Sequence, residues 1–103
     1  MNTKLKSYFG FAKKSRNLVS GYDTCENLIK RNKIKLIIIT GDASERTREK
    51  FRKLTEKAEI PFYMVESSAL MEELTGLEGR NIFGITDENF AKAIAKEITD
   101  MTR

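Results

Sequence analysis

The amino-acid sequence predicts an α/β fold, a three-layer α/β/α sandwich with a small mixed central sheet. Helix-like and strand-like patterns of apolar residues alternate along all 103 residues, with no linker, repeat or low-complexity segment between them. One strand-like segment is apolar on both faces, which is typical of a strand covered by helices on each side. We therefore expect residues 1–103 to form one domain.

The first two elements are predicted to be helices. Leu5, Tyr8, Phe9 and Ala12 recur at three- and four-residue spacing, which predicts an amphipathic helix over residues 3–15 with these residues facing inward. A second helix is expected over residues 21–31, with Cys25 facing the core. Ser20-x-x-Asp23, a capping-box variant with Asp in place of Glu, marks its start.

A buried strand and a long polar helix follow. The segment KLIIIT, residues 35–40, is rich in β-branched residues and apolar on both faces. Asp42, with Glu45 three residues later, predicts a capped helix that ends before Pro61. The expected inward stripe of this helix consists of Thr47, Phe51, Leu54 and Ala58.

The next pattern is strand, helix and strand. Residues 61–65 (PFYMV) and 81–86 (NIFGIT) read as short strands. Ser67 or Ser68 is expected to cap the helix between them, and Gly76 to end it.

A final helix is expected after Thr86, which we predict to be its cap. Its expected inward residues are Phe90, Ile94, Ile98 and Met101. The order is therefore roughly α-α-β-α-β-α-β-α, and residues 18–19 leave room for a short extra strand. Such alternation predicts a parallel or mixed sheet between two helix layers.

Positive charge is concentrated near the beginning of the sequence. Residues 1–35 contain nine Lys and Arg and two acidic residues, a net charge of +7, whereas residues 36–103 contain ten and thirteen, a net charge of −3. This asymmetry is typical of proteins that bind a polyphosphate such as RNA. A lysine-rich solvated surface explains it as well, so charge alone leaves both interpretations open.

The sequence offers no catalytic or metal-binding pattern. It has no histidine, one cysteine and no glycine-rich phosphate loop. Cys25 falls on the inward face of a helix, which favours a buried thiol over a nucleophile, and capping explains Asp42. We therefore expect neither an enzyme nor a bound metal or cofactor.

Three properties favour the cytoplasm. The longest apolar run, Leu36–Ile39, is far shorter than a membrane span. The first 15 residues lack the apolar core of a secretory leader. A single cysteine suits a reducing compartment. We expect a cytoplasmic protein that does not associate with membranes.

Basic residues surround the second predicted helix. They are Lys13, Lys14 and Arg16 before it and Lys30, Arg31, Lys33 and Lys35 at its far end. Gly21 at its start allows close approach of a phosphate to the first-turn amides, whose partial positive charge favours anions. Ser20 and Gly21 also fit an ordinary turn and cap, so local chemistry alone does not decide for an RNA contact.

Four blocks of sequence are more informative together than singly. They are YFGFAKKSRNLVSG (8–21), KIKLIIITGDAS (33–44), IPFYMVESSALMEELTG (60–76) and IFGITDENFAKAI (82–94). Their order and spacing resemble the kink-turn-binding ribosomal protein superfamily, most closely its bacterial YlxQ-like branch, over about residues 6–98. The resemblance implies an α/β/α sandwich that binds sharply bent RNA containing tandem G·A pairs.

The resemblance also implies base-contacting positions. In that family a helix starting after the glycine enters a groove beside the kink, where an Asn-Glu pair and, one turn later, a Lys contact the G·A bases and phosphates. This chain keeps the glycine as Gly21 but has Asp23 and Thr24 in place of the pair and Asn27 in place of the Lys. An aspartate accepts hydrogen bonds but cannot donate them, and an asparagine carries no charge for a phosphate.

Further positions follow from the same comparison. Lys14 and Arg16 match the basic pair before the glycine, and Gly41 stands where many relatives carry an acid. The positions of a hydrophobic loop that covers an extruded nucleotide are taken by Val65, Glu66 and Ser67. Tyr22 is expected either to stack on an unpaired base or to be partly buried against the first helix.

The expected function is that of a small cytoplasmic RNA-binding protein, similar to a ribosomal protein. Its expected partner is structured RNA of the kink-turn type, ribosomal RNA or the ribosome included, without DNA specificity. The alternative is a protein-interaction module of the same fold that has lost kink-turn readout, which the residues at positions 23, 24 and 27 favour.

Overall fold

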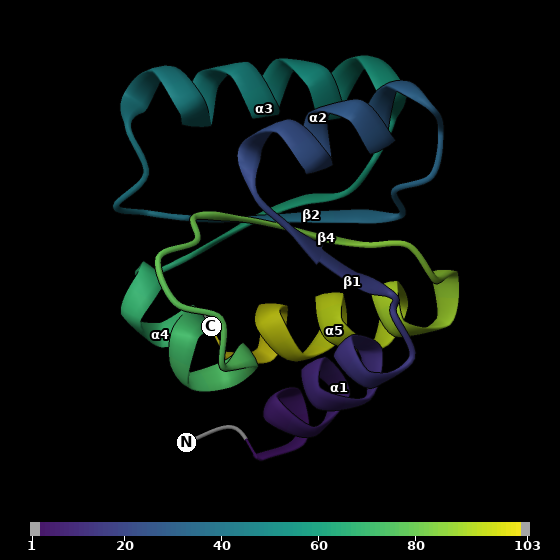
Figure 1. The fold of residues 1–103 in the computed structure, drawn as a ribbon, viewed down its shortest axis with the longest axis vertical. Helices are drawn as coiled ribbons and strands as arrows, with labels where there is room; N and C mark the ends of the chain where they lie inside the picture. The colour runs from purple at the N-terminus through teal and green to yellow at the C-terminus, as the bar shows by residue number, and fades with distance from the viewer. Residues whose placement is uncertain (1–2, 102–103) are drawn as a thin grey trace.

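The computed structural model describes residues 3–101 and contains the predicted alternation of helices and strands (Figure 1). The short strand that the pattern allowed near residues 18–19 is present as β1. The elements are α1 (Thr3–Lys14), β1 (Leu18–Ser20), α2 (Tyr22–Lys30), β2 (Leu36–Thr40), α3 (Glu45–Ala58), β3 (Phe62–Val65), α4 (Ser68–Thr75), β4 (Ile82–Ile85) and α5 (Glu88–Met101).

The four strands form one mixed sheet in the order β1-β4-β2-β3. β4 pairs antiparallel with both β1 and β2, whereas β3 pairs parallel with β2, from Ile37 opposite Phe62 to Thr40 opposite Val65. The prediction of a small mixed sheet is therefore confirmed.

Helices cover both faces of this sheet, as predicted (Figure 1). α1, α4 and α5 lie on one face, and α2 and α3 lie side by side on the other. β2 explains the need for two layers, since Leu36 and Ile38 pack on the first side and Ile37 and Ile39 on the second. Each of these side chains is fully buried, which contributes about 1.5–3 kcal/mol per residue to folding.

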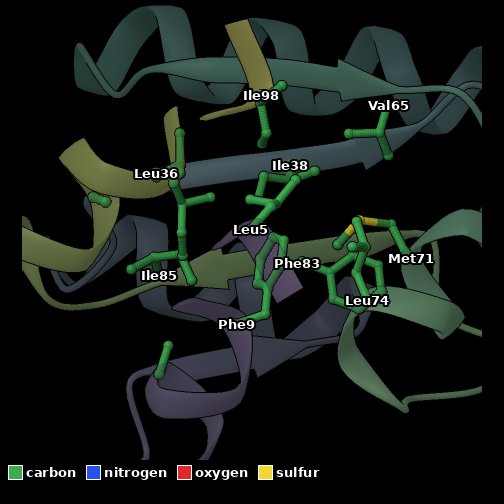
Figure 2. Packing of buried hydrophobic residues seen from close by; sticks show 13 residues of the cluster. Leu5, Phe9, Leu36, Ile38, Val65, Met71, Leu74, Phe83, Ile85 and Ile98 are labelled. Atoms are coloured by element: carbon green, nitrogen blue, oxygen red, sulfur yellow. The ribbon is translucent and has the colours of Figure 1, made fainter. Parts of the chain in front are cut away.

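The larger of the two cores lies under α1, α4 and α5. Figure 2 shows Leu5 and Phe9 of α1 close to Ile38 and Phe83 of the sheet. All four side chains are fully buried, so the predicted inward face of α1 is confirmed.

The starts of α2 and α3 differ from the predictions. Ser20 does not cap α2, because it lies in β1 and the N-cap is Gly21, without a side-chain hydrogen bond. Asp42 does not cap α3, because a turn closed by the Ala43 amide delays the helix by two residues. Ser44 takes that role and accepts from the Thr47 amide at 3.1 Å.

The last two helices confirm one predicted cap and correct another. Ser67 accepts from the Leu70 amide and Gly76, with φ of 76°, ends α4 as expected. The cap of α5 is Asp87, whose carboxylate accepts from the Phe90 amide at 2.9 Å. Thr86 instead donates its hydroxyl to the Asn17 side chain, because β1 lies beside β4.

Candidate nucleic-acid interface

Four segments distant in the sequence meet at one end of the sheet, on the left in Figure 1. They are the start of α2 and the loops β2–α3, β3–α4 and α4–β4. Backbone hydrogen bonds join them: Gly21 N to Ile82 O at 2.9 Å, Thr40 N to Asn81 O at 3.0 Å and Gly41 N to Val65 O at 2.8 Å. We call this end the interface edge, residues 21–24, 41–42, 65–67 and 79–81.

The start of α2 combines exposed amides with a neighbouring cation. Gly21 has φ of 104°, a conformation that side-chain-bearing residues rarely adopt. A Cβ there would lie 3.1 Å from Nη1 of Arg80, so this guanidinium lies beside the helix start. Sequence reasoning missed Arg80: its place directly before a predicted strand was visible, but the pairing of that strand with β1, which brings Arg80 to Gly21, was not predicted.

Tyr22 packs on α3, not on the first helix as one of the two expectations had it. Its ring meets Phe51 edge-on, with centroids 5.2 Å apart, and Nζ of Lys50 lies 4.8 Å from its centroid. The side chain is still 37% exposed, which leaves part of the ring accessible to a ligand. Lys50 also pairs with Glu26 on α2 at 2.9 Å, and so ties α2 to α3.

The predicted base-contacting positions share the exposed face of α2. Asp23 and Thr24 lie in its first turn and Asn27 one turn later, and all three are exposed. Asp23 is the acidic residue in the first turn of α2, where a negative charge interacts favourably with the helix dipole. The arrangement presents an acceptor, a hydroxyl and an amide beside the amides of the helix start.

The predicted covering loop presents fewer side chains than expected. Val65 is only 2% exposed and packs in the larger core, as Figure 2 shows, and Ser67 caps α4. Glu66 is exposed. Gly41 lies against this loop, and a Cβ there would come within 2.8 Å of the Glu66 carbonyl oxygen. The absence of a side chain at position 41 therefore has a steric reason.

Asp42 fastens the β2–α3 loop to the start of α4. Its carboxylate accepts from the amide of Ser68 at 3.0 Å and from the hydroxyl at 2.8 Å. The pKa of Asp42 lies below its ordinary value, because hydrogen bonds from the side chains of Thr40 and Ser68 favour the charged form. Asp42 thus helps to fix the relative positions of two loops of the interface edge.

The basic residues before α2 are not gathered at the interface edge. Lys13 donates to the Thr75 carbonyl at the end of α4, at 3.1 Å, and Lys14 is exposed at the last position of α1. Arg16, with φ of 65°, lies in the turn before β1. Because Gly21 follows that strand, β1 separates Arg16 from the interface edge.

Lys30 and Arg31 also lie away from the interface edge, at the other end of α2. Lys30 pairs with Glu26 at 3.2 Å, and Arg31 is the C-cap. A cavity of about 410 Å³ lies at that opposite end of the sheet, lined among others by Lys35 and Tyr63. The structure therefore brings together the predicted site residues at positions 20–24, 27 and 65–67 but separates them from the basic residues at 16, 30 and 31.

Other sites play no part in this interface. Cys25 is fully buried as predicted, and burial raises the pKa of its thiol to about 12. Within residues 3–101, no group of three His, Cys, Asp or Glu side chains is placed to hold a metal ion. No helix in that same range has the length and apolar character that crossing a membrane demands.

Known proteins resemble this chain over most of its length. It is 33% identical over 85 residues to "RNA-binding protein YlxQ" of Bacillus subtilis (strain 168), covering 82% of this chain and 85% of the relative. The protein of the same name from Enterococcus faecium is 30% identical over 89 residues, covering 86% and 85%. Neither name describes an enzyme, in agreement with the sequence-based expectation.

A solved structure confirms the fold. It is described as a protein with unknown function from Bacillus halodurans C and superposes with a TM-score of 0.89, over 95% of this chain and 99% of the other, at 23% identity. The family model of the ribosomal protein L7Ae/L30e/S12e/Gadd45 family matches residues 3–95. With a match over nearly the whole chain, and with relatives at 30% identity or more, this protein belongs to the ribosomal protein L7Ae/L30e/S12e/Gadd45 family.

Proposed function

We propose that residues 1–103 act as one small RNA-binding unit that holds bent, kink-turn-type RNA against the interface edge. The observation that carries this proposal is the start of α2, where no side chain caps the first turn and Arg80 lies beside Gly21. Within residues 3–101, no ion pair occupies Arg80. Exposed amides with an adjacent cation form a phosphate-binding arrangement, and the names of the relatives support RNA as its ligand.

The side chains around this phosphate site have different roles. Asp23 accepts a hydrogen bond from the amino group of a guanine or cytosine, and the accessible part of Tyr22 offers a stacking surface. Lys14 and Arg16 add long-range attraction from the far end of β1. Ribosomal RNA or the ribosome, in the cytoplasm, is the partner class that the family membership favours.

The test is a binding titration with a consensus kink-turn RNA and a straight duplex at about 50 and 200 mM salt. Affinity for the kink-turn should exceed that for the duplex and fall steeply with salt. Arg80→Gln should reduce the slope of log affinity against log salt by about one. Lys33→Gln is the matched control, because Lys33 is exposed at the opposite end of the sheet, and it should leave the slope unchanged.

Two outcomes would contradict the proposal: affinity independent of salt, or equal losses in the two variants. Asp23→Asn should sharpen the preference for the kink-turn over the duplex, because it removes a negative charge and restores a donor. The exposed Asp23 carboxylate also favours the second candidate, a protein-interaction module, since it repels phosphates at the helix start. A chain purified at low salt with a protein partner and no RNA would support that candidate.

A further inference from the structure

Four of the six basic residues of α3 lie on one flank of the helix, because they recur at intervals of four, three and four residues. We call these four the α3 basic line: Arg46, Lys50, Lys53 and Lys57. The other two are Arg48, whose guanidinium donates to the Gly41 carbonyl, and Arg52. The basic line extends for about 16 Å along the helix axis. The acidic residues form a separate line of Glu45, Glu49 and Glu56.

The acidic line has its own counter-charge. Arg52 pairs with Glu49 and, at 3.9 Å, with Glu56. The same guanidinium is the main cause of a lowered pKa at Glu49. Arg46, Lys53 and Lys57 of the basic line are exposed and take part in no ion pair within the described part of the chain. The charge of Lys53 contributes to the lowered pKa of Glu49, after Arg52.

Lys50 connects the basic line to the interface edge. Its ammonium lies 2.9 Å from the Glu26 carboxylate and 4.8 Å from the centre of the Tyr22 ring. Tyr22 is the first residue of α2, so the line runs from beside the helix start that we assign to RNA. Lys30 pairs with the same carboxylate, so two lysines compensate the charge of Glu26.

Within the basic line, like charges four residues apart, Arg46 with Lys50 and Lys53 with Lys57, oppose the stability of the helix. Glu49, four residues before Lys53, offsets part of this repulsion. An extended polyanion outside the protein reverses that balance, because it binds all the exposed cations at once. A single small anion would engage only one or two positions along the line.

We propose, on the basis of the RNA-binding function above, that the α3 basic line binds the phosphate backbone of the RNA stem that continues from the bend at the interface edge. α2 and α3 lie side by side on one face of the sheet (Figure 1), so a duplex leaving the start of α2 passes over α3. The contacts are to phosphates and are independent of sequence.

The experiment compares two variants that each lose three positive charges. One is Arg46→Gln/Lys53→Gln/Lys57→Gln, which keeps Lys50 because that side chain holds α2 and α3 together. The control is Lys6→Gln/Lys92→Gln/Lys96→Gln, whose positions are exposed on α1 and α5, on the other face of the sheet. Circular dichroism verifies that both variants are folded.

The RNA probes are kink-turns whose two stems are lengthened one at a time. The wild-type protein should bind more tightly when one particular stem is lengthened, and the α3 variant should lose that gain. The slope of log affinity against log salt should fall by about two to three in the α3 variant, as expected for three lost phosphate contacts. The control variant should keep the gain and nearly the full slope.

Failure of this inference is distinguishable from failure of the proposed function. If the wild-type protein binds kink-turn RNA and the α3 variant matches the control, the α3 basic line does not bind the stem, although the proposed function stands. Equal gains from both stems would likewise overturn the inference. If the wild-type protein binds none of these RNAs, the proposed function and the inference fall together.

Discussion

Gly41 is a position where a single methyl group should disturb the interface edge. A Cβ there would lie 2.8 Å from the Glu66 carbonyl oxygen and 3.5 Å from that of Val65. Carbon and oxygen normally approach no closer than about 3.3 Å, so the two loops must separate by roughly 0.5 Å. The obstacle is backbone, and the hydrogen bond from Gly41 to Val65 resists the separation. Overpacking of this kind costs about 1–3 kcal/mol.

Gly10 provides a control of opposite sign. It lies in the middle of α1, and beyond its chain neighbours and the nearby backbone of its own helix a Cβ there would meet no atom within 4 Å. Because alanine is the better helix former, Gly10→Ala should raise the free energy of unfolding by about 0.5–1 kcal/mol. The same substitution thus stabilises at one glycine and destabilises at the other.

The assay is urea unfolding followed by far-ultraviolet circular dichroism. The unfolding midpoint should be highest for Gly10→Ala, intermediate for the wild-type protein and lowest for Gly41→Ala. Thermal unfolding should repeat this order, at about 4–8 °C for each kcal/mol. A midpoint for Gly41→Ala at or above that of the wild-type protein would refute the close approach of the two loops.

Three further predictions concern single residues. Cys25, whose thiol pKa is about 12, should resist thiol reagents at about pH 8 in the folded protein and react once urea unfolds it; prompt reaction of the folded protein would contradict its burial. Hydrogen bonds from Lys50, and to a smaller extent from Lys30, lower the pKa of Glu26. The ionised Glu26 carboxylate therefore stabilises the folded protein above its ordinary pKa of 4.5, and this stabilisation is lost as the pH falls through the lowered pKa. Urea unfolding at several pH values should therefore show Glu26→Gln less stable than the wild-type protein near neutrality and converging with it in acid, whereas a gap that persists in acid would argue against these ion pairs. Ser44→Ala should cost about 1 kcal/mol and Ser20→Ala less than about 0.5 kcal/mol in the same assay, and equal losses would contradict the observed caps.

The elements could be predicted from the sequence because the two cores impose clear periods. Leu36–Ile39 is apolar on both faces, and this run alone predicts two helix layers. The helix caps were less predictable than the elements, because several polar residues compete for each cap within two or three positions. Contacts to residues distant in the sequence decide which of them becomes the cap. Asp42 is such a case, since Ser68 on another element uses its carboxylate.

The candidate site was predictable where it depends on local sequence and not where it depends on strand order. The helix start at Gly21 carries its own signal, a glycine followed by polar residues. Arg80 was missed because only the pairing of β1 with β4 brings it to Gly21. Arg16 was grouped with Gly21 because the two are close in sequence, but a strand separates them in space.

The most direct test of the central claim is the change in amide chemical shifts when labelled protein is titrated with kink-turn RNA. The RNA-binding account predicts large changes at the interface edge, from Gly21 to Thr24, at Gly41 and from Gly79 to Asn81. It predicts small changes at the opposite end of the sheet, around Lys35 and the cavity there. Large changes around Lys35 with an unaltered start of α2 would contradict the account.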